Sequence, residues 1–158
     1  MVITDSQAFG FVSKIVGKDI PLTSFSILMA RYKGSLESAI KGAEKMKNLN
    51  DGDTILISEG CTHHRQCGDI GTQKLPKWLK EYSGKELNFR FTSGKDFPED
   101  LKGVSLVIHC GGCMLNEAEM KSRLNHANEQ NIPIVNYGMA IAYMNGILER
   151  SMEIFKNE

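Results

Sequence analysis

The feature that most constrains the fold is an apolar run at residues 54–58, in which Ile55, Leu56 and Ile57 follow one another. A strand with one solvated face alternates apolar and polar residues, so an unbroken run is typical of a strand covered on both faces of a parallel sheet. Three more strands are predicted at 87–91, 104–108 and 132–135, and helical patterns at 75–82, 117–130 and 139–150 alternate with them. This alternation predicts an α/β fold with an open, mainly parallel sheet of about four strands flanked by helices.

The start of the chain forms a separate short unit in this prediction. Residues 2–4 have the composition of a strand, and a helical pattern begins at Phe9. Residues 19–22 are expected to form an extended connector, because Pro21 restricts the residue before it to extended geometry. One strand and one helix bury too little apolar surface to be stable alone. We therefore expect residues 1–22 to be an appendage and residues 23–158 to form the main domain.

Charge and hydropathy exclude several classes of partner. The 158 residues contain 19 Lys and Arg and 19 Asp and Glu, so no net positive field favours nucleic acid. The longest apolar runs are far shorter than the ~20 residues that span a bilayer. The first residues lack the basic and apolar segments of a signal peptide, so a cytoplasmic protein is expected. Cysteines in that reducing compartment are more often metal ligands or redox groups than disulfides.

All four cysteines and three of the four histidines gather in two segments, 60–67 and 109–113, which contain Cys61, His63, His64, Cys67, His109, Cys110 and Cys113. Each segment follows a predicted strand. In open α/β sheets, ligands bind beyond the carboxyl ends of the strands, where the connecting loops converge. The topology is therefore expected to bring the two segments together.

The residue types in these segments predict a metal site. The Cys110-x-x-Cys113 spacing lets two thiolates bind one centre, and the glycines at 111–112 let the backbone turn with its amides toward sulfur. Cys61 would add a third thiolate from the other segment. An iron-sulfur cluster held by three thiolates leaves one iron for another ligand, and His63 is near enough in sequence to fill that position. Imidazole is displaced more easily than thiolate, so this fourth position is predicted to be exchangeable.

Two alternatives stay open on spacing alone. Three cysteines and one histidine also form structural zinc sites. A dithiol oxidoreductase would use Cys110 and Cys113 as a pair that follows a strand and opens a helix. Among the remaining residues, His109 could donate a hydrogen bond to a cluster sulfide or be satisfied by backbone. His64 is a weaker candidate for the same role. Cys67 is interpreted as an accessory thiol.

Three blocks of sequence carry a resemblance to a known family: residues 22–34 (LTSFSILMARYKG), 61–64 (CTHH) and 109–116 (HCGGCMLN). Together they resemble the C-terminal region of HydF, the maturation GTPase of FeFe-hydrogenases. The resemblance implies a 4Fe-4S cluster on Cys61, Cys110 and Cys113, with His63 as the exchangeable ligand. It also implies that residues 1–22 are a remnant of the dimerisation domain, that residues 23–158 are the cluster-binding domain, and that the protein forms a homodimer.

The resemblance further implies a scaffold or carrier. Such a protein accepts a diiron precursor bearing CO and cyanide, made with two radical-SAM maturases, and delivers it to the apo FeFe-hydrogenase. The family also has a GTPase domain, whose P-loop needs Gly-x-x-x-x-Gly-Lys followed by Ser or Thr. No such run occurs in this sequence. The chain is therefore expected neither to bind nor to hydrolyse GTP, and the family's GTPase domain becomes an expected partner.

Overall fold

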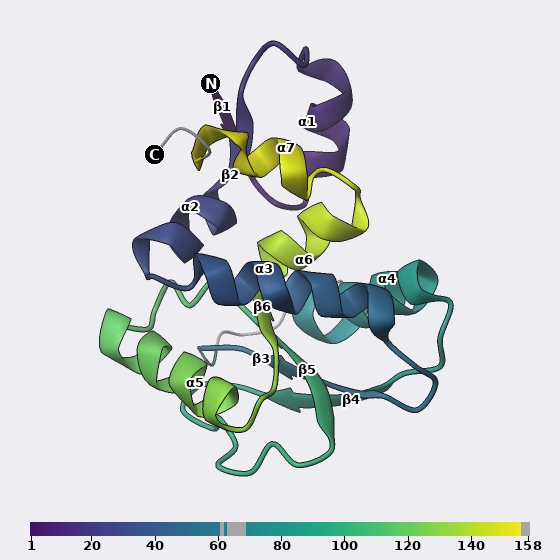
Figure 1. Ribbon diagram of the computed structural model, residues 1–158, viewed down its shortest axis with the longest axis vertical. Helices are drawn as coiled ribbons and strands as arrows, with labels where there is room; N and C mark the ends of the chain where they lie inside the picture. The colour runs from purple at the N-terminus through teal and green to yellow at the C-terminus, as the bar shows by residue number, and fades with distance from the viewer. Residues whose placement is uncertain (61, 63–68, 156–158) are drawn as a thin grey trace.

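A computed structural model describes residues 1–60, 62 and 69–155. Figure 1 shows an α/β domain with a smaller N-terminal unit above it. The strands are β1 (Val2–Thr4), β2 (Leu22–Ser24), β3 (Thr54–Ser58), β4 (Asn88–Thr92), β5 (Val104–His109) and β6 (Ile134–Asn136). The α-helices are α1 (Phe9–Ile15), α2 (Phe25–Tyr32), α3 (Leu36–Lys45), α4 (Leu75–Ser83), α5 (Glu117–Glu129), α6 (Tyr137–Met144) and α7 (Leu148–Met152). Short helical turns are η1 (Met46–Asn48), η2 (Ile70–Lys74) and η3 (Glu153–Phe155).

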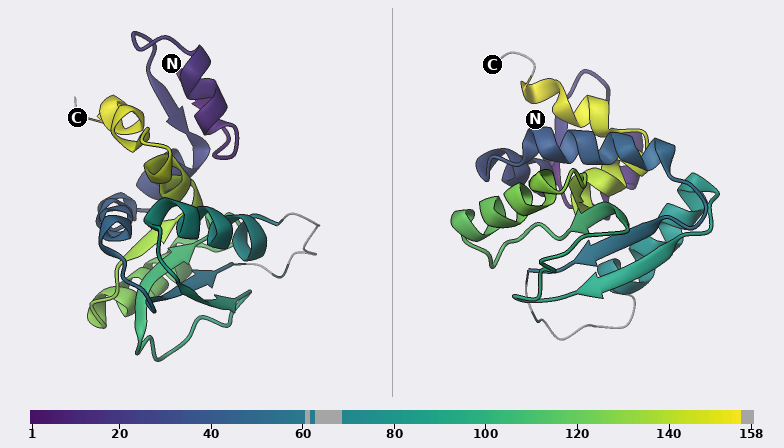
Figure 2. Two further views of the ribbon diagram at one scale, coloured as in Figure 1. Left: turned by 90° about the vertical axis from the view of Figure 1, so that its right-hand side faces the viewer. Right: turned by 60° about the horizontal axis from the view of Figure 1, so that its bottom comes forward.

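The main sheet contains four parallel strands in the order β4-β3-β5-β6. Its two faces are covered by different helices (Figures 1 and 2). Ile55 and Ile57 of β3 belong to the core that also contains residues of α3, α4 and α6, whereas Leu56 belongs to a second core with Leu124 and Ala127 of α5. The unbroken apolar run therefore has the cause expected from the sequence, burial on both faces, and the predicted fold class is confirmed.

Most predicted elements lie within two residues of the observed ones, but the last helix is different. The single helix predicted at 139–150 is wrong: α6 ends at Met144 and α7 begins at Leu148. Gly146 between them has a φ of 69°, a left-handed conformation that ends a helix and that glycine adopts at little cost. In the part of the chain that the structure describes, no helix is long and apolar enough to cross a bilayer.

The N-terminal unit is a β-α-β arrangement. β1 and β2 pair in parallel, Val2 opposite Leu22, and α1 connects them. The expected connector at 19–22 thus leads into a strand, and Leu22 is fully buried. Figure 2 shows this unit beside α7 and apart from the main sheet. Arg150 of α7 joins the two parts, because its guanidinium donates to the carbonyls of Ser13 and Val16 near the end of α1, at 3.1 and 3.0 Å.

Candidate metal centre

The candidate site lies at the carboxyl edge of the main sheet. The register places Ser58 of β3 between Thr92 of β4 and His109 of β5, with Asn136 of β6 next in line. All four strands therefore end at the same edge. β3 is followed in the chain by β4 on one side, whereas β5 is followed by β6 on the other side, so a topological switch point lies between β3 and β5. Ligands in open α/β sheets bind at such points.

Two hydrogen bonds join the loops that follow β3 and β5. The amide of Gly60 donates to Cys110 Sγ at 3.0 Å, and the amide of Cys110 donates to the carbonyl of Ser58 at 2.9 Å. Gly60 immediately precedes Cys61 in the sequence. The described start of the first cysteine-containing segment, Gly60, therefore contacts the second segment at Cys110. The side chains of Cys61, His63, His64 and Cys67 lie outside the described residues.

The Cys110–Cys113 segment is a turn whose carbonyls are held by the protein. Gly112 is buried with a φ of 62°, and its carbonyl accepts hydrogen bonds from the amide of Leu115 and from Nζ of Lys33. Lys33 Nζ also lies 3.3 Å from the carbonyl oxygen of Leu115. The carbonyl of Cys110 is bound by His109 Nδ1 at 2.7 Å.

The amides of this turn, unlike its carbonyls, lack hydrogen-bond partners among the described residues. Within residues 1–60, 62 and 69–155, no hydrogen-bond acceptor is recorded for the amides of residues 111–114. Cys113 is exposed and Cys110 is partly exposed, and both are thiols. Two thiols on one turn, with free amides between and after them, suit an anionic centre that binds to sulfur and accepts N–H donors. The described part of the site therefore fits an iron-sulfur cluster, and equally fits zinc at the level of the two thiols.

His109 is buried beneath the turn and binds the carbonyl of Cys110. Its side chain is 1% exposed, and its Nε2 lies 3.0 Å from Arg123 Nη1. A guanidinium only donates hydrogen bonds, so Nε2 must be the acceptor, and the ring proton is on Nδ1, where it is donated to the carbonyl of Cys110. Burial lowers the pKa of His109 to about 4, and the nearby Arg123 and Lys33 charges act in the same direction. His109 is therefore neutral at pH 7 and acts on the loop through a backbone carbonyl.

Arg123 is itself held firmly. It is 3% exposed, although it occupies the middle of the polar helix α5. It pairs with Glu119 at 3.1 Å, donates to the carbonyl of Gly94 at 2.7 Å, and lies over the ring of Phe97. Its position links α5, the loop after β4 and His109.

Glu59 and Tyr137 also lie at this edge of the sheet, directly after β3 and β6. The Tyr137 hydroxyl donates to Glu59 Oε1 over 3.4 Å. Burial raises the pKa of Tyr137 strongly, and the charges of Glu59 and Cys110 add to the effect, so the phenol stays protonated and is a hydrogen-bond donor. Gly71 closes against this pair, since a Cβ at Gly71 would lie 2.4 Å from the Tyr137 oxygen.

The helix after the turn begins too late for the dithiol interpretation. α5 starts at Glu117, and its N-cap is Asn116, whose side chain accepts from the amide of Glu119 at 2.8 Å. Cys110 and Cys113 therefore lie in a loop and do not open the helix, contrary to the expectation for a thioredoxin-like pair. Among the described residues, no group of three or more His, Cys, Asp or Glu side chains is placed to hold a metal ion. The described residues therefore include two of the predicted ligands, Cys110 and Cys113, and the other two, Cys61 and His63, lie outside them.

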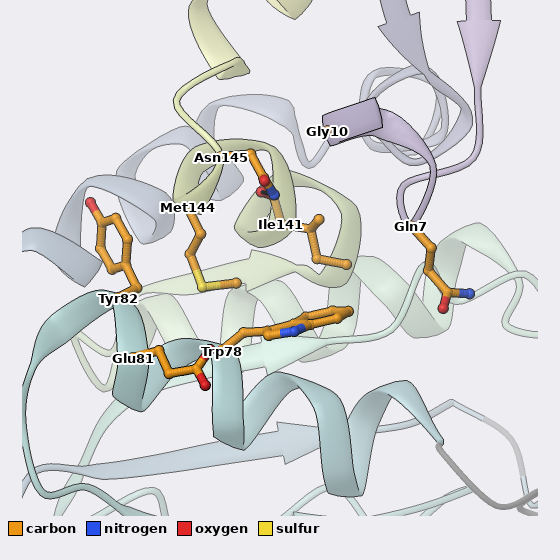
Figure 3. A pocket seen from close by; sticks show the side chains of 8 residues that line it. All are labelled: Gln7, Gly10, Trp78, Glu81, Tyr82, Ile141, Met144 and Asn145. Carbon is orange, nitrogen blue, oxygen red and sulfur yellow. Dashed lines mark hydrogen bonds between the residues drawn. The ribbon is translucent and has the colours of Figure 1, made fainter. Parts of the chain in front are cut away.

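A hollow of about 450 Å³ lies elsewhere, between the N-terminal unit and helices α4 and α6 (Figure 3). Trp78, Ile141 and Met144 form its apolar wall, and Gln7 and Glu81 contribute polar groups. Among the described residues that line this hollow there is neither a cysteine nor a histidine. It is therefore separate from the candidate metal centre.

Lys33, Glu59, Arg123 and Tyr137 contribute to the site and were not predicted from the sequence. Lys33 ends a helix and has the appearance of a cation that favours the helix C-terminus. Arg123 lies four residues after Glu119, a spacing typical of an exposed ion pair. Neither pattern indicates burial beside a turn, so the sequence held no usable signal for them.

Comparison with known proteins identifies the family. A family model described as the hydrogen maturase F tetramerization domain matches residues 37–154, and one described as the hydrogen maturase F dimerization domain matches residues 1–34. The two matches meet close to the start of α3, whereas the sequence analysis divided the chain after residue 22. A search of curated proteins gives no match. Since the matches cover nearly all of the chain, it belongs to the HydF family of hydrogenase maturases.

Proposed function

We propose that this chain is a non-catalytic scaffold that holds a 4Fe-4S cluster for hydrogenase maturation. Cys61, Cys110 and Cys113 would supply the thiolates, and His63 would be the exchangeable fourth ligand. In this role the protein receives a diiron precursor with CO and cyanide ligands from radical-SAM maturases and passes it to the apo FeFe-hydrogenase in the cytoplasm. The family's GTPase domain would act on this chain as a partner.

The observation that carries the proposal is the hydrogen bond from Gly60 to Cys110 Sγ. It brings the residue before Cys61 into contact with a sulfur of the Cys110–Cys113 pair, which supports a centre that draws its thiolates from two loops. Three thiolates are one fewer than a complete set for a 4Fe-4S cluster. When bound, such a cluster offers one iron to a weaker or external ligand, which is the property a carrier needs.

In this proposal the backbone of the turn after β5 holds the cluster ligands and donates hydrogen bonds to sulfur. The turn after β5 presents Cys110 and Cys113 at the surface while its carbonyls are bound on the inner side by His109 and Lys33. Its amides at 111–114 can then donate to sulfur. The names of the two matched family domains support assembly of two or more copies of this chain.

Anaerobic reconstitution of cysteine variants tests the ligand set. Cys61→Ser, Cys110→Ser and Cys113→Ser should each lose most of the bound iron and sulfide and the EPR signal of the reduced protein. Cys67→Ser is the matched control and should keep them. Retention of a full cluster in any of the first three variants would contradict the assignment, and a colourless wild-type protein holding one zinc would support the structural zinc alternative.

A further inference from the structure

Lys33 is a buried lysine beside the candidate centre. Its side chain is 6% exposed, and its ammonium donates to the carbonyls of Gly112 and Leu115, on either side of Cys113. Nothing in the proposed ligand set includes it. It comes from the end of α2, 79 residues before Gly112 in the sequence.

The charge on Lys33 lacks a protein counter-ion in the described part of the chain. No described carboxylate forms an ion pair with it, whereas the other buried cation of the site, Arg123, is paired with Glu119. Burying a charge is costly unless it is compensated. Two carbonyl oxygens compensate only partly, so an anionic group on the far side of the turn would be stabilised by this ammonium.

Gly112 lies between the Lys33 ammonium and helix α5. A Cβ at Gly112 would lie 3.7 Å from Lys33 Nζ and 2.8 Å from Met120 Sδ. The turn is therefore in ordinary contact with the lysine on one side and packs closely against Met120 of α5 on another. Lys33 therefore binds the backbone on both sides of Cys113, at Gly112 before it and at Leu115 after it.

We propose that Lys33 is a positioning residue that fixes the Cys110–Cys113 turn and places a positive charge beside a thiolate-bound metal centre. The first half concerns the turn and applies to any metal bound by these thiols. The second half rests on the proposed function, because it concerns the charge of an iron-sulfur cluster. A nearby cation stabilises the more negative, reduced state and so raises the reduction potential.

The test compares Lys33→Met, which removes the charge and the donor, with Lys33→Arg, which keeps both. Lys41→Met is the matched control, since Lys41 is an exposed lysine on α3. Cobalt(II) is titrated into the metal-free proteins and followed by thiolate-to-cobalt absorption. Lys33→Met should bind cobalt about 10- to 100-fold more weakly than wild type, the usual loss when a group that orients a ligand is removed. Lys33→Arg should recover part of that loss, and Lys41→Met should be unchanged.

Wild-type cobalt affinity in Lys33→Met would overturn the positioning role. Thermal unfolding is measured in parallel, and Lys33→Gln is the second uncharged variant if Lys33→Met does not fold. The charge is tested in reconstituted protein, where Lys33→Met should have a more negative midpoint potential than Lys41→Met. Equal potentials would overturn that half. Failure of the wild type to take up a cluster would count against the proposed function, while the cobalt titration would still decide the role of Lys33 in the turn.

Discussion

The two glycines between Cys110 and Cys113 have different requirements. Gly112 has a φ of 62°, and an added Cβ would meet Met120 Sδ at 2.8 Å, whereas a Cβ at Gly111 would meet nothing within 4 Å. A left-handed conformation costs a non-glycine residue roughly 1–2 kcal/mol. Gly112 is therefore fixed by backbone geometry and packing, and Gly111 is not.

We predict that Gly112→Ala lowers the free energy of unfolding of the metal-free protein by about 2 kcal/mol and weakens metal binding. Gly111→Ala is the matched control and should change stability by less than about 0.5 kcal/mol, as exposed substitutions usually do. Urea unfolding and cobalt(II) titration measure the two effects. Equal behaviour of the two variants would show that the turn does not have the described geometry.

His109 makes stability depend on pH. Its pKa is lowered to about 4 by burial, below the ordinary value of 6.5, so the unfolded chain takes up a proton before the folded protein does. Stability from this residue is fully present above pH 6.5 and is lost as the pH falls toward 4, with a total of about 3 kcal/mol.

The pH profile of urea unfolding, measured on metal-free wild type and His109→Gln, tests this. The wild type should lose about 3 kcal/mol more than the variant between pH 7 and pH 4. The other titrating groups are common to both proteins and cancel in the difference. Parallel profiles would mean that His109 is not buried as a neutral ring.

At the scale of elements, α3 packs unusually closely on β6. A Cβ at Gly42 of α3 would lie 2.3 Å from the carbonyl oxygen of Ile134. In an ordinary helix, replacing glycine by alanine is favourable by about 1 kcal/mol. Here the added methyl group would meet backbone, which cannot move aside as a side chain can.

Gly42→Ala should therefore destabilise the protein by about 1–3 kcal/mol, opposite in sign to the helix propensity. The free energy of unfolding from urea titration measures it, and Lys41→Ala at an exposed position of the same helix is the control. A more stable Gly42→Ala variant would show that α3 and β6 are farther apart than described.

The sequence predicted the elements best where the pattern had a single cause. The run at 54–58 became β3 because both of its faces are buried, and Ser24 caps α2 as its side chain accepts from Ile27. The helix predicted at 139–150 failed because its apolar pattern continues through Gly146, where the backbone is left-handed. The strand β2 was missed because its residues follow Pro21 and precede a helix, so they were interpreted as the end of an extended connector and a helix N-cap.

For the site, sequence and topology together predicted which loops meet but not what holds them. The approach of the two cysteine segments follows from parallel strands that end at one edge. Lys33 and Arg123 were not predicted, because their roles depend on burial by segments far away in the chain. The hydrogen bond between Lys33 and Gly112 has no local signature at either residue.

At the scale of the whole molecule, Arg150 ties the two family-matched regions together. Its guanidinium donates to carbonyls of the N-terminal unit, including those of Ser13, Val16 and Ile20. Arg150→Met should remove about 2 kcal/mol of stabilisation from that unit, because hydrogen bonds to charged groups contribute about 1.5–3 kcal/mol. Hydrogen exchange should accelerate in residues 9–20.

The main sheet supplies the internal control for Arg150→Met, since exchange in β3 and β5 should stay at the wild-type rate. Arg150→Lys keeps the charge but has one donor group, so it should give an intermediate effect. Uniform acceleration throughout the chain would contradict a local role for Arg150.

The central claim is that Cys61, Cys110 and Cys113 hold an iron-sulfur cluster. Its most direct test is the content of iron, zinc and acid-labile sulfide in wild-type protein purified without oxygen and reconstituted. We expect about four irons and four sulfides per chain, as a 4Fe-4S cluster requires, with little zinc. One zinc per chain without sulfide, or no bound metal, would contradict it.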